Sequence, residues 1–203
     1  GFKGSWLSYW LLMMGSDVFG YSLLPKQDLS IFGKLRLKNE FCNIEGDIRD
    51  YELLKSSLEK FNPDIIIHLA AQPIVYEGYR DPVETFSTNI MGTVNLLDIV
   101  KSSEKKVITL IISSDKCYEN NDKIQSFKIS DRLGGKDPYS ASKAGTEIVT
   151  TSFFKSFYKQ KENLFLASCR AGNVIGGGDW SEFRLIPDAV KSFIDKKPLV
   201  IRN

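Results

Sequence analysis

The sequence has few of the residues on which metal and disulfide chemistry depend. It contains one histidine, His68, and three cysteines, Cys42, Cys117 and Cys169, whose spacing fits no metal site. A single histidine disfavours both a histidine metal centre and a Ser-His-Asp triad, so we expect no bound metal. A sparse, odd set of cysteines is typical of a reducing compartment, which predicts a cytoplasmic protein.

Charge of one sign and long hydrophobic runs are also lacking. The formal net charge is +2 over 203 residues, with lysine and arginine scattered along the chain. This gives no reason to expect nucleic acid or a membrane surface as a partner. An apolar run at residues 6–14 is too short to span a bilayer. Because the chain begins with Gly1 and not with methionine, we interpret it as a fragment that starts inside a domain.

Segments typical of strands alternate with segments typical of helices along the whole chain. Strands are expected at residues 17–23, 40–44, 64–69, 107–112, 164–168 and 199–201. Helices are expected at residues 5–14, 51–61, 83–102 and 186–196, and around Tyr139. Residues 25–39 are polar and predict no element. The alternation predicts an α/β fold with a doubly wound parallel sheet and helices on both faces.

The pair Tyr139 and Lys143 is the first candidate for chemistry. On a helix, a spacing of four residues puts both side chains on one face. A phenol with a pKa of about 10 is a poor base at neutral pH, but a neighbouring ammonium group lowers that pKa. The pair is therefore a candidate base for taking a proton from an alcohol. The alternative is a solvated helix face on which both residues occur by chance.

Glycines near the start of the chain indicate a site for a dinucleotide. Gly1 and Gly4 precede the first expected helix, as in turns that place a pyrophosphate on a helix N-terminus. A simple turn explains two glycines equally well. The following strand ends in Tyr21, Ser22 and Leu23, without the acidic residue that binds the adenosine ribose in NAD enzymes. This leaves NAD and NADP open, and the lack of a nearby arginine favours NAD.

Small and polar residues follow several of the expected strands. They are residues 70–71 (Ala-Ala), 114–116 (Ser-Asp-Lys) and Asn173. In an open parallel sheet, the carboxyl ends of the strands form the ligand-binding edge, where Tyr139 is also expected. This coincidence favours the catalytic interpretation of Tyr139 and Lys143 over the solvated helix face.

Six segments resemble the extended short-chain dehydrogenase/reductase family, which includes NAD-dependent epimerases and dehydratases. They are residues 1–7, 46–50, 68–73, 114–118, 170–180 and 184–187. The resemblance implies an NAD-binding Rossmann domain at residues 1–169 that lacks its first strand. It also implies that residues 170–203 begin a nucleotide-sugar-binding region, most of which is missing, and that the protein forms a homodimer or a larger homo-oligomer.

The resemblance also assigns binding residues. The residues expected to bind NAD are Gly1, Phe2, Gly4, Asp47, Ile48, Leu69, Ala70, Ala71, Asn89, Tyr139 and Lys143. The residues expected to bind the substrate are Gln72, Ser114, Asn173, Arg184 and Leu185. For Asp47, a role as a turn residue is the alternative to a contact with the adenine amino group.

Within this family, the segments resemble dehydratases that act on CDP-D-glucose. Tyr139 would then take the proton of the C4 hydroxyl, and Ser114 would hydrogen-bond the C4 oxygen. Asp115 would be the acid for the C6 hydroxyl if burial raises its pKa. Lys116 would take the C5 proton if its pKa lies well below about 10.4. The alternative for Lys116 is electrostatic pairing with Asp115 or with a substrate oxygen.

Two other functions stay open at this point. A nucleotide-sugar 4-epimerase would share Tyr139 and Lys143 but would not need the acid–base pair Asp115 and Lys116. A non-catalytic NAD-binding protein, or an inactive fragment, would keep the fold without the reaction. For the dehydratase, the implied pathway supplies deoxysugars to lipopolysaccharide or other surface glycans.

Overall fold

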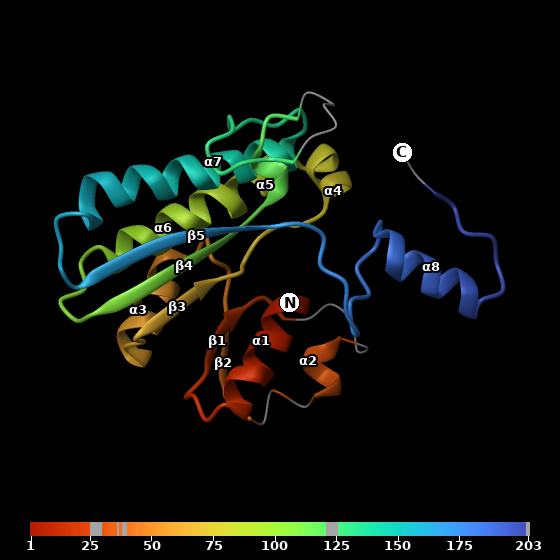
Figure 1. Ribbon diagram of the computed structural model, residues 1–203. Coiled ribbons are helices and arrows are strands. Elements are labelled where there is room, and N and C mark those ends of the chain that lie inside the picture. The colour runs from red at the N-terminus through yellow and green to blue at the C-terminus, as the bar shows by residue number, and fades with distance from the viewer. Residues whose placement is uncertain (25–29, 36, 38–39, 121–125, 202–203) are drawn as a thin grey trace. The chain divides into compact units, whose positions relative to one another are not determined.

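The computed structural model describes most of the chain (Figure 1). The described residues are 1–24, 30–35, 37, 40–120 and 126–201. They have the predicted α/β character and fall into two compact units. The first unit consists of Gly1–Gly20, Leu24–Asn43 and Asn173–Asn203. The second unit consists of Tyr21–Leu23 and Ile44–Gly172.

The second unit is built on a parallel sheet of three strands in the order β3-β4-β5. The strands are β3 (Ile65–His68), β4 (Val107–Ser114) and β5 (Leu164–Ala171). Ile111 of β4 pairs with His68 on one side and with Ser168 on the other. The strands predicted at residues 64–69, 107–112 and 164–168 are confirmed. The last two continue further, so β4 reaches Ser114.

Helices connect these strands in the alternating order that the sequence predicts. They are α3 (Tyr51–Phe61), α4 (Val75–Arg80), α5 (Pro82–Phe86), α6 (Gly92–Val100) and α7 (Pro138–Phe153). The Asp50 carboxylate caps α3 by accepting a 3.0 Å hydrogen bond from the Leu53 amide. The single helix predicted at residues 83–102 is instead α5, the π-helical turn η2 (Ser87–Met91) and α6 in succession.

A hydrophobic core lies between the sheet and its helices. Its buried members include Leu54 of α3, Leu97 of α6 and Ile111 of β4. Tyr158 completes it from a second π-helical turn, η4 (Phe154–Tyr158), and its hydroxyl donates to the Leu97 carbonyl over 3.0 Å. Figure 1 shows α6 and α7 running side by side along the sheet, where they contact each other. The core therefore fixes α7, the helix that carries Tyr139.

The first unit contains α1 (Phe2–Met13), α2 (Ile31–Lys34) and α8 (Leu185–Ile194). Helix α1 begins at Phe2 and not at Ser5, so Gly4 lies in its first turn. The reason is that the Ser5 amide closes that turn on the Gly1 carbonyl over 2.9 Å. Gly15 ends the helix with a φ of 81°, a left-handed conformation that glycine adopts without steric cost.

Strands β1 (Phe19–Ser22) and β2 (Cys42–Glu45) form a two-stranded sheet and confirm two predicted strands. Helix α2 falls in the segment predicted to be irregular, of which residues 25–29, 36 and 38–39 lie outside the described part. The strand predicted at residues 199–201 is wrong, because these residues form no strand and are exposed. An apolar run becomes a strand only when a neighbouring strand pairs with it.

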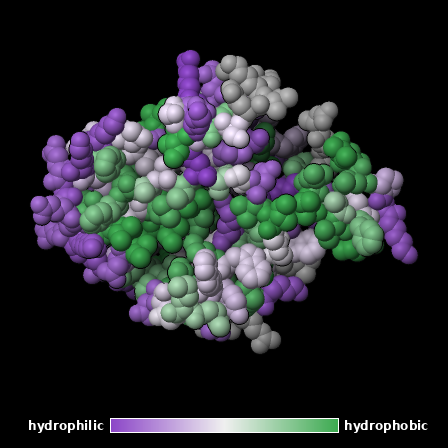
Figure 2. All heavy atoms as spheres, in the orientation of Figure 1, coloured by the Kyte–Doolittle hydropathy of each residue, from purple (hydrophilic) through white to green (hydrophobic). Residues whose placement is uncertain are grey.

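Exposed apolar side chains are conspicuous on helix α8. Leu185, Val190, Phe193 and Ile194 are all exposed, and Figure 2 shows hydrophobic side chains gathered over this helix. Across the described part of the chain, no helix combines the length and the apolar character needed to cross a membrane.

Candidate active site

Tyr139 and Lys143 lie on α7, one turn apart and both buried. The helix begins at Asp137, whose carboxylate accepts hydrogen bonds from the amide and hydroxyl of Ser140 at 2.9 and 2.6 Å. Pro138 occupies the first helical position, where its fixed φ favours the helix. These caps hold Tyr139 in the first turn. With Tyr139 9% exposed and Lys143 6% exposed, the solvated helix face is excluded.

Strand β4 delivers Ser114, Asp115 and Lys116 beside this helix. The Ser114 hydroxyl donates to Asp115 Oδ1 over 3.0 Å and accepts from the Lys116 amide over 3.2 Å. This double contact begins the 3-10 turn η3 (Asp115–Cys117), which packs against α7. Asp115 is half-buried and Lys116 is exposed. The structure thus brings the predicted acid–base pair and the predicted redox base onto adjoining elements.

Asn89 braces the loop after β3 against α7. Its Oδ1 accepts from the Gln72 amide over 2.8 Å, and its Nδ2 donates to Ser142 Oγ over 2.8 Å. The Gln72 side chain is also engaged, with the Thr85 hydroxyl at 2.7 Å and the Ile74 amide at 2.6 Å. The predicted contacts of Asn89 with NAD and of Gln72 with the substrate stay predictions, and both residues have a structural role here.

His68 ends β3 as a buried and neutral residue. Its Nε2 lies 3.2 Å from Thr93 Oγ1, and that hydroxyl donates to the Asn89 carbonyl over 2.8 Å. The hydroxyl proton is thereby used, so the imidazole donates through Nε2–H. Burial, followed by the charge of Lys143, lowers the pKa of His68 to about 4. His68 is therefore uncharged at neutral pH.

Asp47 is held by an arginine two residues further along the chain. Its Oδ1 accepts from the amide and from Nε of Arg49, each over 2.9 Å, and its Oδ2 pairs with Nη2 over 2.5 Å. Hydrogen bonds from Arg49 lower the pKa of Asp47. Arg49 also pairs with Glu84. Ile48 is buried in the core. Contacts of Asp47 and Ile48 with a cofactor stay predictions.

Residues 69–71, also expected to bind the cofactor, follow β3 directly. Leu69, Ala70 and Ala71 are half-buried, and Ala70 packs against the core of the second unit. They continue from His68 at the carboxyl end of a parallel strand, which is where the sequence predicted them. Their contact with a cofactor stays a prediction.

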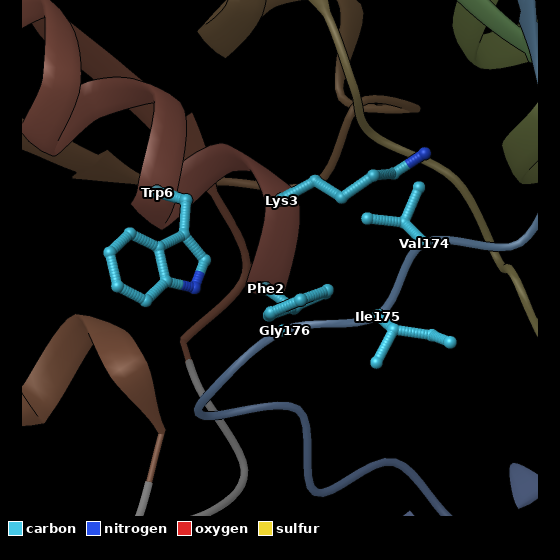
Figure 3. Close-up of a pocket in the computed structure, with 6 residues that line it drawn as sticks. All are labelled: Phe2, Lys3, Trp6, Val174, Ile175 and Gly176. Atoms are coloured by element: carbon cyan, nitrogen blue, oxygen red, sulfur yellow. The ribbon is translucent and has the colours of Figure 1, made fainter. Parts of the chain in front are cut away.

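In the first unit, a pocket of about 290 Å³ lies at the first turn of α1. Figure 3 shows its lining side chains, which are Phe2, Lys3, Trp6, Val174, Ile175 and Gly176. Trp6 Nε1 donates to the Gly177 carbonyl over 2.9 Å and ties the helix to this segment. Lys3 and Trp6 were missed in the sequence, although both lie inside the Gly1–Leu7 motif. Burial, followed by the charge of Arg184, lowers the pKa of Lys3.

Three predicted substrate residues belong to the same unit. Asn173 is exposed, and Leu185 begins α8 as an exposed residue. Arg184 pairs with Asp179 over 3.1 Å, and the Asp179 side chain is only 5% exposed. The predicted site residues therefore divide between the units. The first unit contains Gly1, Phe2, Gly4, Asn173, Arg184 and Leu185. The second unit contains the other predicted site residues, among them Tyr139 and Lys143.

Sequence comparison identifies the class of protein. The family model described as GDP-mannose 4,6 dehydratase matches residues 1–196. The chain therefore belongs to the GDP-mannose 4,6 dehydratase family. It is also similar to CDP-glucose 4,6-dehydratase of Salmonella typhimurium, with 46% identity over 207 residues, covering 100% of this chain and 58% of the relative. The chain thus spans a little over half the length of that relative.

Solved structures confirm the Rossmann-like fold. A UDP-glucose 4-epimerase from Thermotoga maritima superimposes with a TM-score of 0.84 at 22% identity, covering 100% of this chain and 63% of that one. A dTDP-glucose 4,6-dehydratase from Streptomyces venezuelae, with NAD bound, gives a TM-score of 0.80 at 25% identity, covering 98% of this chain and 61% of that one. Epimerases and dehydratases therefore share this fold, and the fold does not separate them.

Proposed function

We propose that the full-length protein is an NAD-dependent hydro-lyase that converts CDP-D-glucose into CDP-4-dehydro-6-deoxy-D-glucose. One observation carries this proposal. Buried Tyr139 and Lys143 lie on α7, and α7 packs against the turn that bears Asp115 and Lys116. An epimerase needs the first pair only, whereas a dehydratase also needs an acid and a base. The 46% identity with CDP-glucose 4,6-dehydratase supports CDP-glucose as the substrate.

The residues present fit a bound NAD. Glycines and an apolar pocket lie at the first turn of α1, whose free amides favour a phosphate group. Gly1, Phe2 and Gly4 would contact the cofactor there, and Asp47, Ile48, residues 69–71, Asn89, Tyr139 and Lys143 would contact the rest of it. When bound, NAD would accept a hydride from C4 of the sugar and later return it to C6.

The chain's own residues would move the protons. Tyr139 takes the C4 hydroxyl proton, with Lys143 favouring the phenolate and Ser114 hydrogen-bonding the C4 oxygen. The resulting C4 ketone acidifies the C5 proton, which Lys116 removes as the neutral amine. Asp115 protonates the C6 hydroxyl as its bond to carbon breaks, and water leaves. Lys116 then returns a proton to C5, and the hydride that NAD would return to C6 would balance the atoms and charges of the product.

The proposal also covers the substrate contacts, the domains, the location and the assembly of the protein. Gln72, Ser114, Asn173, Arg184 and Leu185 would contact the nucleotide sugar. Residues 1–169 would belong to the NAD-binding domain, and residues 170–203 to the substrate-binding region. The sparse cysteines support a cytoplasmic location. A homo-oligomer, and a role in supplying deoxysugars for lipopolysaccharide or other surface glycans, complete the proposal.

A substrate panel tests the proposal. Full-length protein with NAD is incubated separately with CDP-glucose, dTDP-glucose, UDP-glucose and GDP-mannose. We expect the alkaline absorbance of a 4-keto-6-deoxy sugar with CDP-glucose above all. CDP-galactose formed without loss of water would favour an epimerase. Binding of NAD with no turnover of any of the four would favour a non-catalytic protein.

A further inference from the structure

Glu147 is a buried carboxylate that the reaction does not use. It lies one helical turn beyond Lys143 on α7, and its side chain is 3% exposed. Its Oε2 accepts from Ser168 Oγ over 2.9 Å and from Arg170 Nη2 over 3.0 Å, and both donors lie on β5. A buried carboxylate is costly unless it is paired. The ion pair with Arg170 therefore compensates for the cost of burying the Glu147 carboxylate.

Arg170 also contacts the segment that follows Asp115 and Lys116. Its guanidinium carbon lies 4.8 Å from the ring centroid of Tyr118, within the range of a cation–π contact. Its Nη1 also donates to the Ile129 carbonyl over 3.1 Å. The Tyr118 ring stacks on Phe127, with centroids 4.6 Å apart and an interplanar angle of 8°. One guanidinium thus links α7, β5 and the residues around Tyr118.

Tyr118 and Lys116 have little room to move independently of each other. Cys117 lies between them, is fully buried, and its carbonyl accepts from the Gly134 amide over 3.0 Å. Tyr118 itself forms an antiparallel bridge with Leu133. A displacement of Tyr118 therefore reaches Lys116 through a single intervening residue.

We propose that Glu147 and Arg170 are positioning residues that set the place of Asp115 and Lys116 relative to Tyr139. Because Glu147 lies on the helix of Tyr139, the pair ties the redox base and the acid–base turn to one framework. Loss of the pair then slows elimination of water while leaving oxidation at C4 largely intact. This inference rests on the proposed function and goes beyond it by assigning two residues to one step.

A double substitution tests the inference without leaving a buried charge. In the Glu147→Leu/Arg170→Met variant both charges are lost, and apolar replacement of a buried pair is often tolerated. Dehydration is followed with CDP-glucose. Oxidation at C4 is followed with CDP-6-deoxy-D-glucose, which has no C6 hydroxyl to lose, as the near-ultraviolet absorbance of the reduced nicotinamide. We expect dehydration to fall by about 10- to 100-fold, and C4 oxidation to change by no more than about twofold.

Two single variants make the result specific. Arg170→Lys keeps the charge but cannot donate to Glu147 and to the Ile129 carbonyl in the geometry of the guanidinium. We therefore expect a smaller loss of dehydration rate, again with little change in C4 oxidation. Arg132→Gln breaks an exposed pair with Glu119, 3.3 Å long, on the same segment, and should alter neither step.

The outcomes separate the two proposals. Equal losses in both steps, or no loss in either, in a folded double variant would overturn the positioning role. If wild-type protein yields neither reduced cofactor nor dehydrated product, the proposed function itself fails, and the positioning inference fails with it. Circular dichroism of each variant confirms that it is folded before the rates are compared.

Discussion

Asn89 Nδ2 donates a 2.8 Å hydrogen bond to Ser142 Oγ and so joins the turn η2 to the helix of the redox base. Ser142 in turn donates to the Tyr139 carbonyl over 2.7 Å. Asn89 is 2% exposed, and its side chain also binds the backbone amide and carbonyl of Gln72. Every polar atom of this amide is therefore used inside the protein, which makes Asn89 a stabilising residue whatever else it contacts.

Replacing Asn89 with alanine should destabilise the protein strongly. The substitution leaves the amide and carbonyl of Gln72 without their partner, and we expect the free energy of unfolding to fall by about 2 to 4 kcal/mol. Urea unfolding of the full-length protein measures this. Asn95→Ala is the matched control, because Asn95 makes longer bonds of 3.3 and 3.2 Å to the carbonyls of Ile48 and Arg49. Equal losses in the two variants would contradict the bracing role.

His68 should make stability depend on pH. Its pKa is about 4 when folded and about 6.5 when unfolded, so the unfolded chain binds more protons between these values. Stability therefore rises with pH across this window and is level above it. We expect a loss of about 2 kcal/mol between about pH 7 and about pH 5.

The variant His68→Gln isolates this effect. A glutamine amide can donate to Thr93 in place of Nε2–H, but it does not titrate in this window. The slope of unfolding free energy between about pH 5 and about pH 7 should therefore be shallower in the variant. An unchanged slope would mean that His68 is not the group responsible.

Asp47 offers a test of the cofactor site. Asp47→Asn removes a carboxylate that is proposed to accept a hydrogen bond from NAD, so we expect the dissociation constant for NAD to rise by about tenfold. Asp98→Asn is the control, since Asp98 is similarly exposed and also forms an ion pair, with Lys101. Isothermal titration with NAD gives both constants. If the two variants bind equally well, Asp47 only orders Arg49.

Lys116 offers a test of the base. Lys116→Met should slow dehydration of CDP-glucose by about 10²- to 10⁴-fold, the usual contribution of a positioned base. Oxidation of CDP-6-deoxy-D-glucose at C4 should continue. Lys159→Met, at an exposed lysine beyond α7, should change neither rate. Dehydration near the wild-type rate in Lys116→Met would leave Lys116 with no more than an electrostatic role.

Local chemistry made much of the fold predictable. Successive apolar residues marked β3, β4 and β5, although Ile65 of β3 and Phe165 of β5 are exposed. Capping preferences, which operate within a few residues, explain why Asp50 and Gly15 lie at helix ends. Tyr139 and Lys143 were found because their types and spacing are themselves the chemical signal, whereas Asp115 was found by its place after a strand and by the family resemblance.

Long-range contacts explain what the sequence did not predict. Helix α4 and the π-helical turn η2 both contact α7, and no local pattern in the sequence predicts them. Glu147 and Arg170 lie 23 residues apart, and only the packing of α7 against β5 makes them a pair. The apolar residues 199–201 matched a strand by composition, but composition does not supply a pairing partner.

Transfer of isotope from C4 to C6 tests the central claim most directly. Full-length protein with NAD is given CDP-glucose that carries deuterium at C4, and the product is analysed by mass spectrometry and NMR. The account predicts a product lighter by one water, with the deuterium at C6 and a ketone at C4. A product that has lost no water and keeps deuterium at C4, as CDP-galactose would, contradicts it.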